Sequence, residues 1–376
     1  MTAVDKQPVA EAAEAPKPSS GGVRGRFARL PWPARAGVIL VALVLAYLLP
    51  YVGQVPVIGP QIETQGIDWP SALFSISYFV LLALGLNVVV GFAGLLDLGY
   101  VGFFAVGAYT VALLTSPDSV LNLRWAWLAA VPVAIVIALL SGLVLGWPTL
   151  RLRGDYLAIV TLGFAEIIRI SADSAPFLRG DRGFGGLARP PGEFGGEPLF
   201  NVRDAKPYFW LGLTTIILVI LAVRNLDRSR VGRSWLAIRE DEEVAEIMGV
   251  RTIKFKLWAF AIGACVGGFG GVMFAGYQGF MNSSTFQLQF SILVLAGVVM
   301  GGSGNIPGAI LGGALISYIP DRLRGISLAG TDLFQWRFVL FGCLIIVIMI
   351  FRPQGLIPSR RRAMELKDRA KEVAPQ

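Results

Sequence analysis

Two oppositely charged residues, Glu166 and Arg169, lie within an otherwise apolar stretch over 155–172. At 1.5 Å per helical residue, Glu166 is about 16 Å from Asp155 and therefore near the middle of a membrane core about 30 Å thick. Arg169 follows three residues later on the same helical face, where the two side chains can pair. Charges inside a membrane indicate a transport pathway by default. A self-satisfied pair at a helix interface is an equal alternative.

Three other polar residues interrupt apolar stretches: Asn87, Asp97 and Gln278. Asn87 and Gln278 are weaker pathway candidates, because polar side chains also bridge membrane helices. Asp97 is expected to cap the start of the span over 96–116 rather than to contact substrate.

Several kinds of chemistry are excluded. The chain has no histidine, which rules out serine–histidine hydrolysis and histidine metal sites. Cys265 and Cys343 lie in separate apolar runs and predict neither a disulfide nor a metal site. The glycine-rich run 301–305 lacks the following Gly-Lys-Ser/Thr of a phosphate loop, so this chain is not expected to bind ATP. We expect no catalytic residues, no metal and no cofactor.

The elements that must position these residues are membrane helices. Of the 376 residues, 55% are hydrophobic and 15% are charged, against about 25% charged in ordinary globular chains. A span needs about 20 apolar residues. The sequence therefore predicts an all-α, polytopic transmembrane bundle of eight to ten spans, eight if one hairpin is re-entrant. The apolar segments are 36–52, 71–92, 96–116, 126–149, 155–172, 208–224, 255–279, 287–302, 306–320 and 337–352.

The distribution of basic residues predicts the orientation. The segments assigned to the cytoplasm (1–35, 150–154, 224–256, 352–376) hold 23 of the 33 Lys and Arg residues in 98 positions. The segments assigned to the outside (53–70, 117–125, 173–207, 280–286, 321–337) hold 9 in 86 positions. Basic residues gather on cytoplasmic loops, so both termini are expected inside. The net charge of +8 is thereby explained without nucleic acid.

Three regions follow from this topology. Residues 1–35 are expected to form a disordered cytoplasmic tail, 36–352 the transmembrane domain, and 353–376 a second cytoplasmic tail. The outer loop 173–207 is rich in glycine and proline, and loops of this length are usually functional or disordered.

The cytoplasmic segment 225–256 is expected to contain a short amphipathic helix. Trp235, Ile238 and Val244 recur at helical spacing, five acidic residues crowd 240–246, and Gly249 stands where a helix would stop. A solvated connection between two spans and a helix that docks into a partner are both compatible with this pattern. We expect a helix over 239–248 outside the membrane, ended by Gly249, with the apolar side chains of Val244, Ile247 and Met248 exposed to a partner.

Residues 243–249, EVAEIMG, resemble the E-A-A-x-x-x-G pattern of permease subunits of ATP-driven importers, with Val244 in place of the first alanine. In that family the segment is the coupling helix, seated in a nucleotide-binding subunit. The resemblance assigns ATPase coupling to five residues: Arg239, Glu243, Ala245, Ile247 and Gly249.

Four further motifs resemble the LivM-type permease of branched-chain amino acid ABC importers. They are LNVVVGFAGLLDLGYVGFFAVGAY at 86–109, LRLRGDYLAIVTLGFAEIIR at 150–169, GRSWLAIRED at 232–241 and RPQGLIP at 352–358. The resemblance implies an importer-permease fold in a bacterial inner membrane and transport of Leu, Ile or Val. It also implies four kinds of partner: a second homologous permease, two cytoplasmic ATP-binding subunits, an extracytoplasmic amino-acid-binding protein and membrane lipid.

Alternative functions remain open on the sequence alone. Urea and short-amide permeases are near relatives of the same type. An ion-coupled secondary transporter would need titratable groups along its path, and it would have no use for an acidic docking helix. A membrane enzyme lacks a catalytic constellation here.

Glycines carry two further expectations. Six of them crowd one span, at 263, 267, 268, 270, 271 and 276, where small residues allow helices to approach closely. In addition, 91–103 and 268–280 agree at seven of thirteen positions. An internal repeat with similar backbone paths would explain the match, and so would coincidence in a chain with 45 glycines.

Overall fold

Each of the ten apolar segments contains a helix in the computed structural model of the protein. The helices are α2 (Trp32–Leu48), α4 (Trp69–Leu86), α5 (Tyr100–Thr115), α6 (Trp127–Thr149), α7 (Asp155–Ser174), α8 (Lys206–Arg228), α9 (Arg230–Glu240), α10 (Glu242–Ile247), α11 (Thr252–Gln278), α12 (Leu288–Gly301), α13 (Ile306–Leu323) and α14 (Arg337–Phe351). The structure describes residues 31–56, 66–149, 154–194, 196–201, 204–324, 327–328, 331–352 and 355–357.

Shorter elements connect these helices. They are η1 (Leu49–Gln54), the π-helical turn η2 (Asn87–Phe92), η3 (Pro176–Leu178), η4 (Gly180–Arg182), η5 (Ser283–Phe286) and η6 (Leu333–Trp336). Two-residue strands form three antiparallel pairs: β1 (Phe184–Gly185) with β4 (Phe280–Met281), β2 (Glu193–Phe194) with β3 (Glu197–Pro198), and β5 (Ser327–Leu328) with β6 (Thr331–Asp332). The described part of the chain is thus almost entirely helical, and the all-α prediction is confirmed.

The chain divides into two compact units, 1–49 and 50–376. The first contains α2, which begins at Trp32, inside the stretch predicted as a tail. Pro33 lies in its first turn, where the missing N–H of proline has no helical partner to lose. Residues 1–30 of the predicted tail lie outside the described residues.

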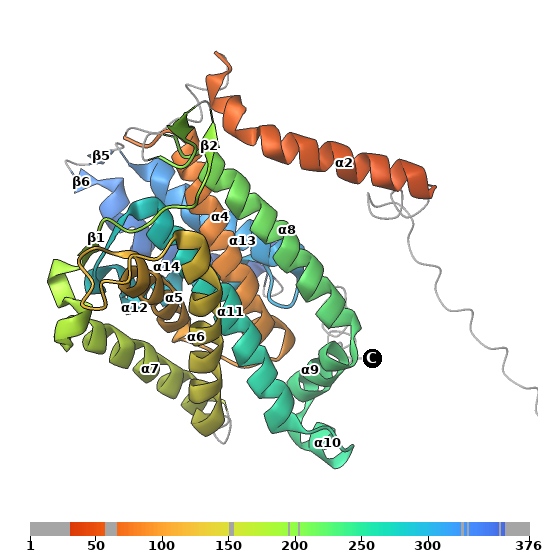
Figure 1. The fold of residues 1–376 in the computed structure, drawn as a ribbon. Helices are drawn as coiled ribbons and strands as arrows, with labels where there is room; N and C mark the ends of the chain where they lie inside the picture. The colour runs from red at the N-terminus through yellow and green to blue at the C-terminus, as the bar shows by residue number, and fades with distance from the viewer. Residues whose placement is uncertain are drawn as a thin grey trace, which may run out of the picture. The chain divides into compact units, whose positions relative to one another are not determined.

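The second unit is built around α11, which packs mainly against α6, α5 and α4 (Figure 1). Its glycines make this packing possible, as predicted. A Cβ at Gly271 would collide with the backbone of Phe104 on α5, and one at Gly268 would collide with the side chain of Ala138 on α6. The Tyr100 hydroxyl donates a hydrogen bond to the carbonyl oxygen of Gly263 at 2.9 Å, which satisfies a buried polar group at the same interface.

The segments 173–207 and 225–256 lie at opposite ends of the helices. Helix α8 connects them, with β2 near its first end and α9 and α10 at its last end (Figure 1). Its 23 residues extend over about 34 Å, enough to cross a membrane core. The predicted separation of the two segments is therefore confirmed.

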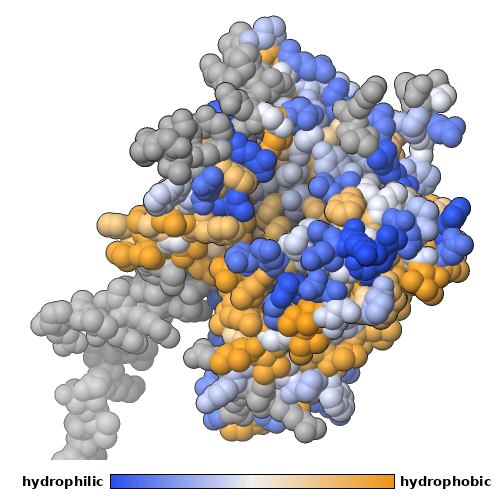
Figure 2. All heavy atoms as spheres, turned by 90° about the vertical axis from the view of Figure 1, so that its left-hand side faces the viewer, coloured by the Kyte–Doolittle hydropathy of each residue, from blue (hydrophilic) through white to orange (hydrophobic). Residues whose placement is uncertain are grey.

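Six helical segments among the described residues are long and apolar enough to span a membrane: Ala36–Gln54, Trp69–Phe92, Trp127–Thr149, Lys206–Arg228, Thr252–Gln278 and Ser283–Gly301. Figure 2 shows hydrophobic side chains across the middle of one face, with hydrophilic side chains above and below them. The protein is therefore a multi-pass membrane protein.

The predicted repeat is wrong. In the first segment π-helix η2 ends at Phe92, residues 93–99 are not helical, and Gly94 has a φ of +72°. In the second segment α11 continues without interruption to Gln278. The matching glycines serve different purposes, a turn in one case and close helix packing in the other, so the match is compositional.

Candidate functional site

Helix α9 is fixed to the bundle by its apolar face. The Ser229 hydroxyl caps its start and accepts a hydrogen bond from the backbone N–H of Val231 at 3.1 Å. Trp235 is 1% exposed, and its Nε1 donates a hydrogen bond to the carbonyl oxygen of Phe255 on α11 at 2.7 Å. Ile238 is also buried. Both apolar residues therefore anchor the segment to its own chain.

The prediction of one helix over 239–248 is wrong, because Asp241 divides it into α9 and α10. The backbone of Asp241 is extended, with φ −156° and ψ 113°. Its carboxylate accepts hydrogen bonds from the backbone N–H groups of Glu243 and Val244, at 2.9 and 3.0 Å. A short acidic side chain that satisfies the free N–H groups of a helix start favours a new helix at this point.

Helix α10 exposes an apolar tip. The side chains of Val244, Ile247 and Met248 are 54%, 84% and 78% exposed, as predicted. Ala245 is buried on the opposite side. We call these three exposed residues the α10 tip. Apolar side chains clustered in this way indicate a surface that another molecule covers.

Gly249 ends α10 as predicted. Its φ is +85°, and its N–H donates to the carbonyl oxygen of Glu246 at 2.9 Å. The N–H of Val250 donates to the carbonyl oxygen of Ala245 at 3.0 Å. These two bonds are the Schellman pattern, which requires left-handed backbone at the glycine position.

A buried ion pair joins α10 to α11. The Nζ of Lys256 lies against Glu242 Oε1, and the lysine side chain is only 2% exposed. A buried ammonium without a carboxylate partner would be costly, so the pair fixes the start of α10 relative to the long central helix.

Arg239, one of the predicted coupling residues, reaches from α9 into the bundle. Its Nη1 donates a hydrogen bond to the carbonyl oxygen of Gly91 on η2. A Cβ at Gly304, in the turn between α12 and α13, would meet the same guanidinium at 2.6 Å. The Oδ1 of Asn87 accepts a hydrogen bond from the N–H of Gly304 at 2.8 Å. We call Asn87, Gly91, Arg239 and Gly304 the glycine junction.

Residues from the terminal RPQGLIP motif complete the same region. The N–H of Leu356 donates to the carbonyl oxygen of Met300 at 2.9 Å, and that of Ile357 donates to Gly301 at 3.0 Å. The Nδ2 of Asn305 donates to the carbonyl oxygen of Ile357 at 2.9 Å. Residues 355–357, predicted as part of a tail, thus satisfy the last carbonyls of α12. Residues 353–354 and 358–376 lie outside the described residues.

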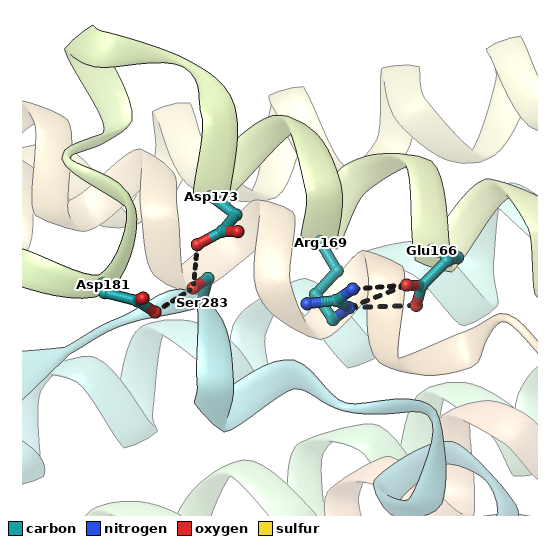
Figure 3. Close-up of polar contacts among 5 residues, drawn as sticks. All are labelled: Glu166, Arg169, Asp173, Asp181 and Ser283. Atoms are coloured by element: carbon teal, nitrogen blue, oxygen red, sulfur yellow. Dashed lines mark hydrogen bonds and ion pairs between the residues drawn. The ribbon is translucent and has the colours of Figure 1, made fainter.

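Glu166 and Arg169 form the predicted ion pair on α7. The Nε of Arg169 donates to both carboxylate oxygens of Glu166 at 3.0 Å (Figure 3). The Glu166 side chain is 39% exposed and that of Arg169 is 29% exposed. The same helix also exposes Ile167 and Ile170. Farther along α7, Asp173 accepts a hydrogen bond from the Ser283 hydroxyl at 3.1 Å.

The four predicted pathway residues do not converge. Glu166 and Arg169 pair with each other on α7, whereas Asn87 belongs to the glycine junction. Gln278 is exposed at the other end of the bundle, in the last turn of α11. Asp97 is fully buried, and its Oδ1 accepts from the N–H of Gly99 at 2.8 Å. Gly99 rather than Asp97 is the cap residue of α5, so that prediction is wrong in detail.

A cavity of about 370 Å³ lies at the end of the bundle opposite the glycine junction. Apolar side chains from α4, α12 and α13 form one part of its wall, including Phe79, Phe290 and Leu293. Ser317 lies among them with its Oγ buried, and no residue in the described part of the chain forms a hydrogen bond with it. We call this cavity the outer pocket.

Charged residues form the other part of the outer pocket. Asp321 pairs with Arg324 at 3.4 Å, and Arg337 lies nearby at the start of α14. Asp321 lies beyond the apolar part of α13, and burial raises the pKa of its carboxyl while Arg324 opposes that rise. These residues were not predicted from the sequence. The i, i+3 pair of charges directly after the apolar segment 306–320 was the available signal.

Comparisons with known proteins identify the family of the chain. Residues 70–349, well over half of the chain, match the family described as branched-chain amino acid transport system / permease component. The chain is 38% identical to the high-affinity branched-chain amino acid transport system permease protein LivM of Escherichia coli K12, over 78% of this chain and 70% of that protein. It is 37% identical to LivM of Salmonella typhimurium, over 77% and 70%, and 24% identical to the permease protein LivH of Escherichia coli K12, over 75% and 91%. The chain therefore belongs to the family of branched-chain amino acid transport system permease components.

Proposed function

We propose that this permease forms half of the pathway for Leu, Ile and Val in an ATP-driven importer, and that a second homologous permease forms the other half. The names of its relatives support the substrate class, since the similar LivM and LivH proteins are both permeases of branched-chain amino acid systems. The chain itself is a transport subunit, so ATP hydrolysis belongs to its partners.

The observation that carries this proposal is the α10 tip. Two large apolar side chains are exposed on the six-residue helix α10 and a third directly after it, while Ala245 and Glu242 hold the helix to the bundle. An apolar groove in a cytoplasmic ATP-binding subunit is the cover that we propose for them, with Glu243 at its rim. Two such subunits and an extracytoplasmic amino-acid-binding protein complete the importer.

The proposed mechanism is alternating access. The two ATP-binding subunits close on ATP and displace α10. Its displacement passes to α11 through Lys256, and through the adjoining helix α9 to η2, which Arg239 contacts. Both connections end on elements that line the interior of the bundle, so the two permeases open outward and receive the amino acid from the binding protein.

We further propose a bacterial inner-membrane location with eight to ten spans and both termini in the cytoplasm. The excess of Lys and Arg at the α9–α10 end supports this orientation. Single cysteines at Asn225 and Arg182, both exposed, test it with a membrane-impermeant thiol reagent. Labelling from outside at position 225 but not at 182 would overturn the orientation.

Reconstitution tests the function directly. The full importer in proteoliposomes should accumulate labelled leucine in the presence of ATP and the binding protein, and should not accumulate urea. Accumulation of urea alone would reassign the substrate. Leucine uptake driven by an ion gradient without ATP would assign the chain to secondary transport instead.

A further inference from the structure

We propose that the outer pocket is a binding site for a free zwitterionic amino acid with an aliphatic side chain. This inference rests on the proposed function and adds to it the place where the permease itself contacts its substrate. None of the pathway residues expected from the sequence lies in this pocket.

The charges of the pocket suit both ends of a zwitterion. Asp321, whose side chain is 13% exposed, offers a carboxylate for the α-ammonium group. Arg337 offers a guanidinium for the α-carboxylate, in the planar geometry that suits carboxylate recognition. Among the side chains that the structure describes, no carboxylate forms an ion pair with Arg337.

Aromatic stacking holds the two arginines in place. The guanidinium carbons of Arg324 and Arg337 lie 4.3 and 4.2 Å from the ring centroid of Phe334. Arg337 also stacks on Phe338 at 4.7 Å. Stacked guanidinium groups lose less freedom when they bind a ligand, because their planes are already oriented. With two arginines and one aspartate, the pocket attracts the carboxylate end of a zwitterion first.

The remaining wall suits an aliphatic side chain. Phe79, Phe290, Leu293 and Ile316 surround the inner part of the pocket. A volume of about 370 Å³ lies within the range of small-ligand sites. Ser317 supplies a buried polar atom that has no hydrogen-bond partner among the described residues, so a ligand that donates or accepts a hydrogen bond there would satisfy it.

Thiol protection in the assembled importer tests the site. Cys265 and Cys343 are first replaced by alanine, and Ser317→Cys then serves as the reporter in the pocket. Val120→Cys, 72% exposed at the same end of the bundle, serves as the control reporter. Leucine without the binding protein should slow the reaction of a small thiol reagent at position 317 and leave position 120 unaffected. If Ser317→Cys fails to assemble, Ser284→Cys at the exposed rim of the pocket replaces it.

Ligands that lack one charge identify the contacts. Leucinamide lacks the carboxylate, and 4-methylpentanoate lacks the ammonium group, so each should require about a tenfold higher concentration than leucine for half protection. Arg337→Gln should raise that concentration about tenfold for leucine but not for leucinamide. Asp321→Asn should do so for leucine but not for 4-methylpentanoate. Arg182→Gln, an exposed arginine outside the pocket, should change none of these values.

Two outcomes would overturn the proposal. One is the absence of leucine protection at position 317 and at position 284. The other is equal protection by all three ligands, which would indicate unspecific apolar binding. Leucine uptake by the same proteoliposomes is measured in parallel. Uptake without protection refutes the pocket alone, whereas protection without uptake leaves the pocket in place and refutes the proposed importer.

Discussion

Gly249 allows a test of coupling in which only the backbone is perturbed. Its φ of +85° lies in the left-handed region, and a Cβ at this position would meet no atom within 4 Å. Gly249→Val therefore introduces backbone strain without a steric clash. Left-handed backbone costs an L residue about 1–2 kcal/mol, which corresponds to a loss of about five- to thirtyfold in the population of the native α10 terminus.

The assay is leucine uptake per ATP hydrolysed by the full importer in proteoliposomes. We expect Gly249→Val to lower this ratio by about fivefold or more, with unchanged insertion and assembly. Gly249→Asn is the matched control, because asparagine adopts left-handed backbone with little strain. The asparagine variant should keep most of the coupling.

Two results would refute this reasoning. An unchanged ratio in Gly249→Val, with normal assembly, would remove the coupling role of the helix end. Equal losses in the valine and asparagine variants would show that any side chain at this position interferes, so that the backbone conformation would not be the cause.

Three further predictions concern the same segment. Arg239→Gln removes the charged donor to the Gly91 carbonyl, a bond worth about 1.5–3 kcal/mol, and should lower leucine uptake about tenfold without loss of inserted protein. Ile247→Asp should abolish co-purification of the ATP-binding subunit. The free energy of unfolding of the isolated permease should change by no more than about 0.5 kcal/mol, because the side chain is exposed. Glu242→Gln leaves Lys256 buried without its carboxylate, so it should lower the unfolding temperature more than the double substitution Glu242→Gln with Lys256→Gln. A larger decrease in the double variant would show that the ion pair does not stabilise α10.

The helices could be predicted from the sequence because each depends on a local property, a run of apolar residues long enough to span a membrane. The exposed α10 tip could also be predicted from a local property, because Val244, Ile247 and Met248 lie among acidic residues. The break at Asp241 was missed because the apolar periodicity continues across it. The extended backbone of Asp241 and the hydrogen bonds of its carboxylate mark the start of a new helix.

The outer pocket and the glycine junction could not be predicted, because both depend on contacts between distant segments. Arg337 and Phe79 are far apart in the sequence, and each alone is an ordinary residue at a helix end or on a membrane helix. Likewise, the sequence shows Asn87 only as a polar residue in an apolar run, whereas its contact with Gly304 follows from how α4 and α13 pack. The glycines shared by 91–103 and 268–280 suggested an internal repeat, although they serve a turn in one segment and helix packing in the other.

The length of α11 has a consequence for the opposite face of the membrane. Its 27 residues form a rod about 40 Å long, with Lys256 near one end and strand β4 directly after the other. A tilt of about 10° around the Lys256 end would move the far end by about 7 Å, by the geometry of a rigid lever. Because β4 is hydrogen-bonded to β1, the loop over 173–207 would be carried along. A spectroscopic probe on that loop would then detect a movement of the loop when nucleotide binds on the other side of the bilayer.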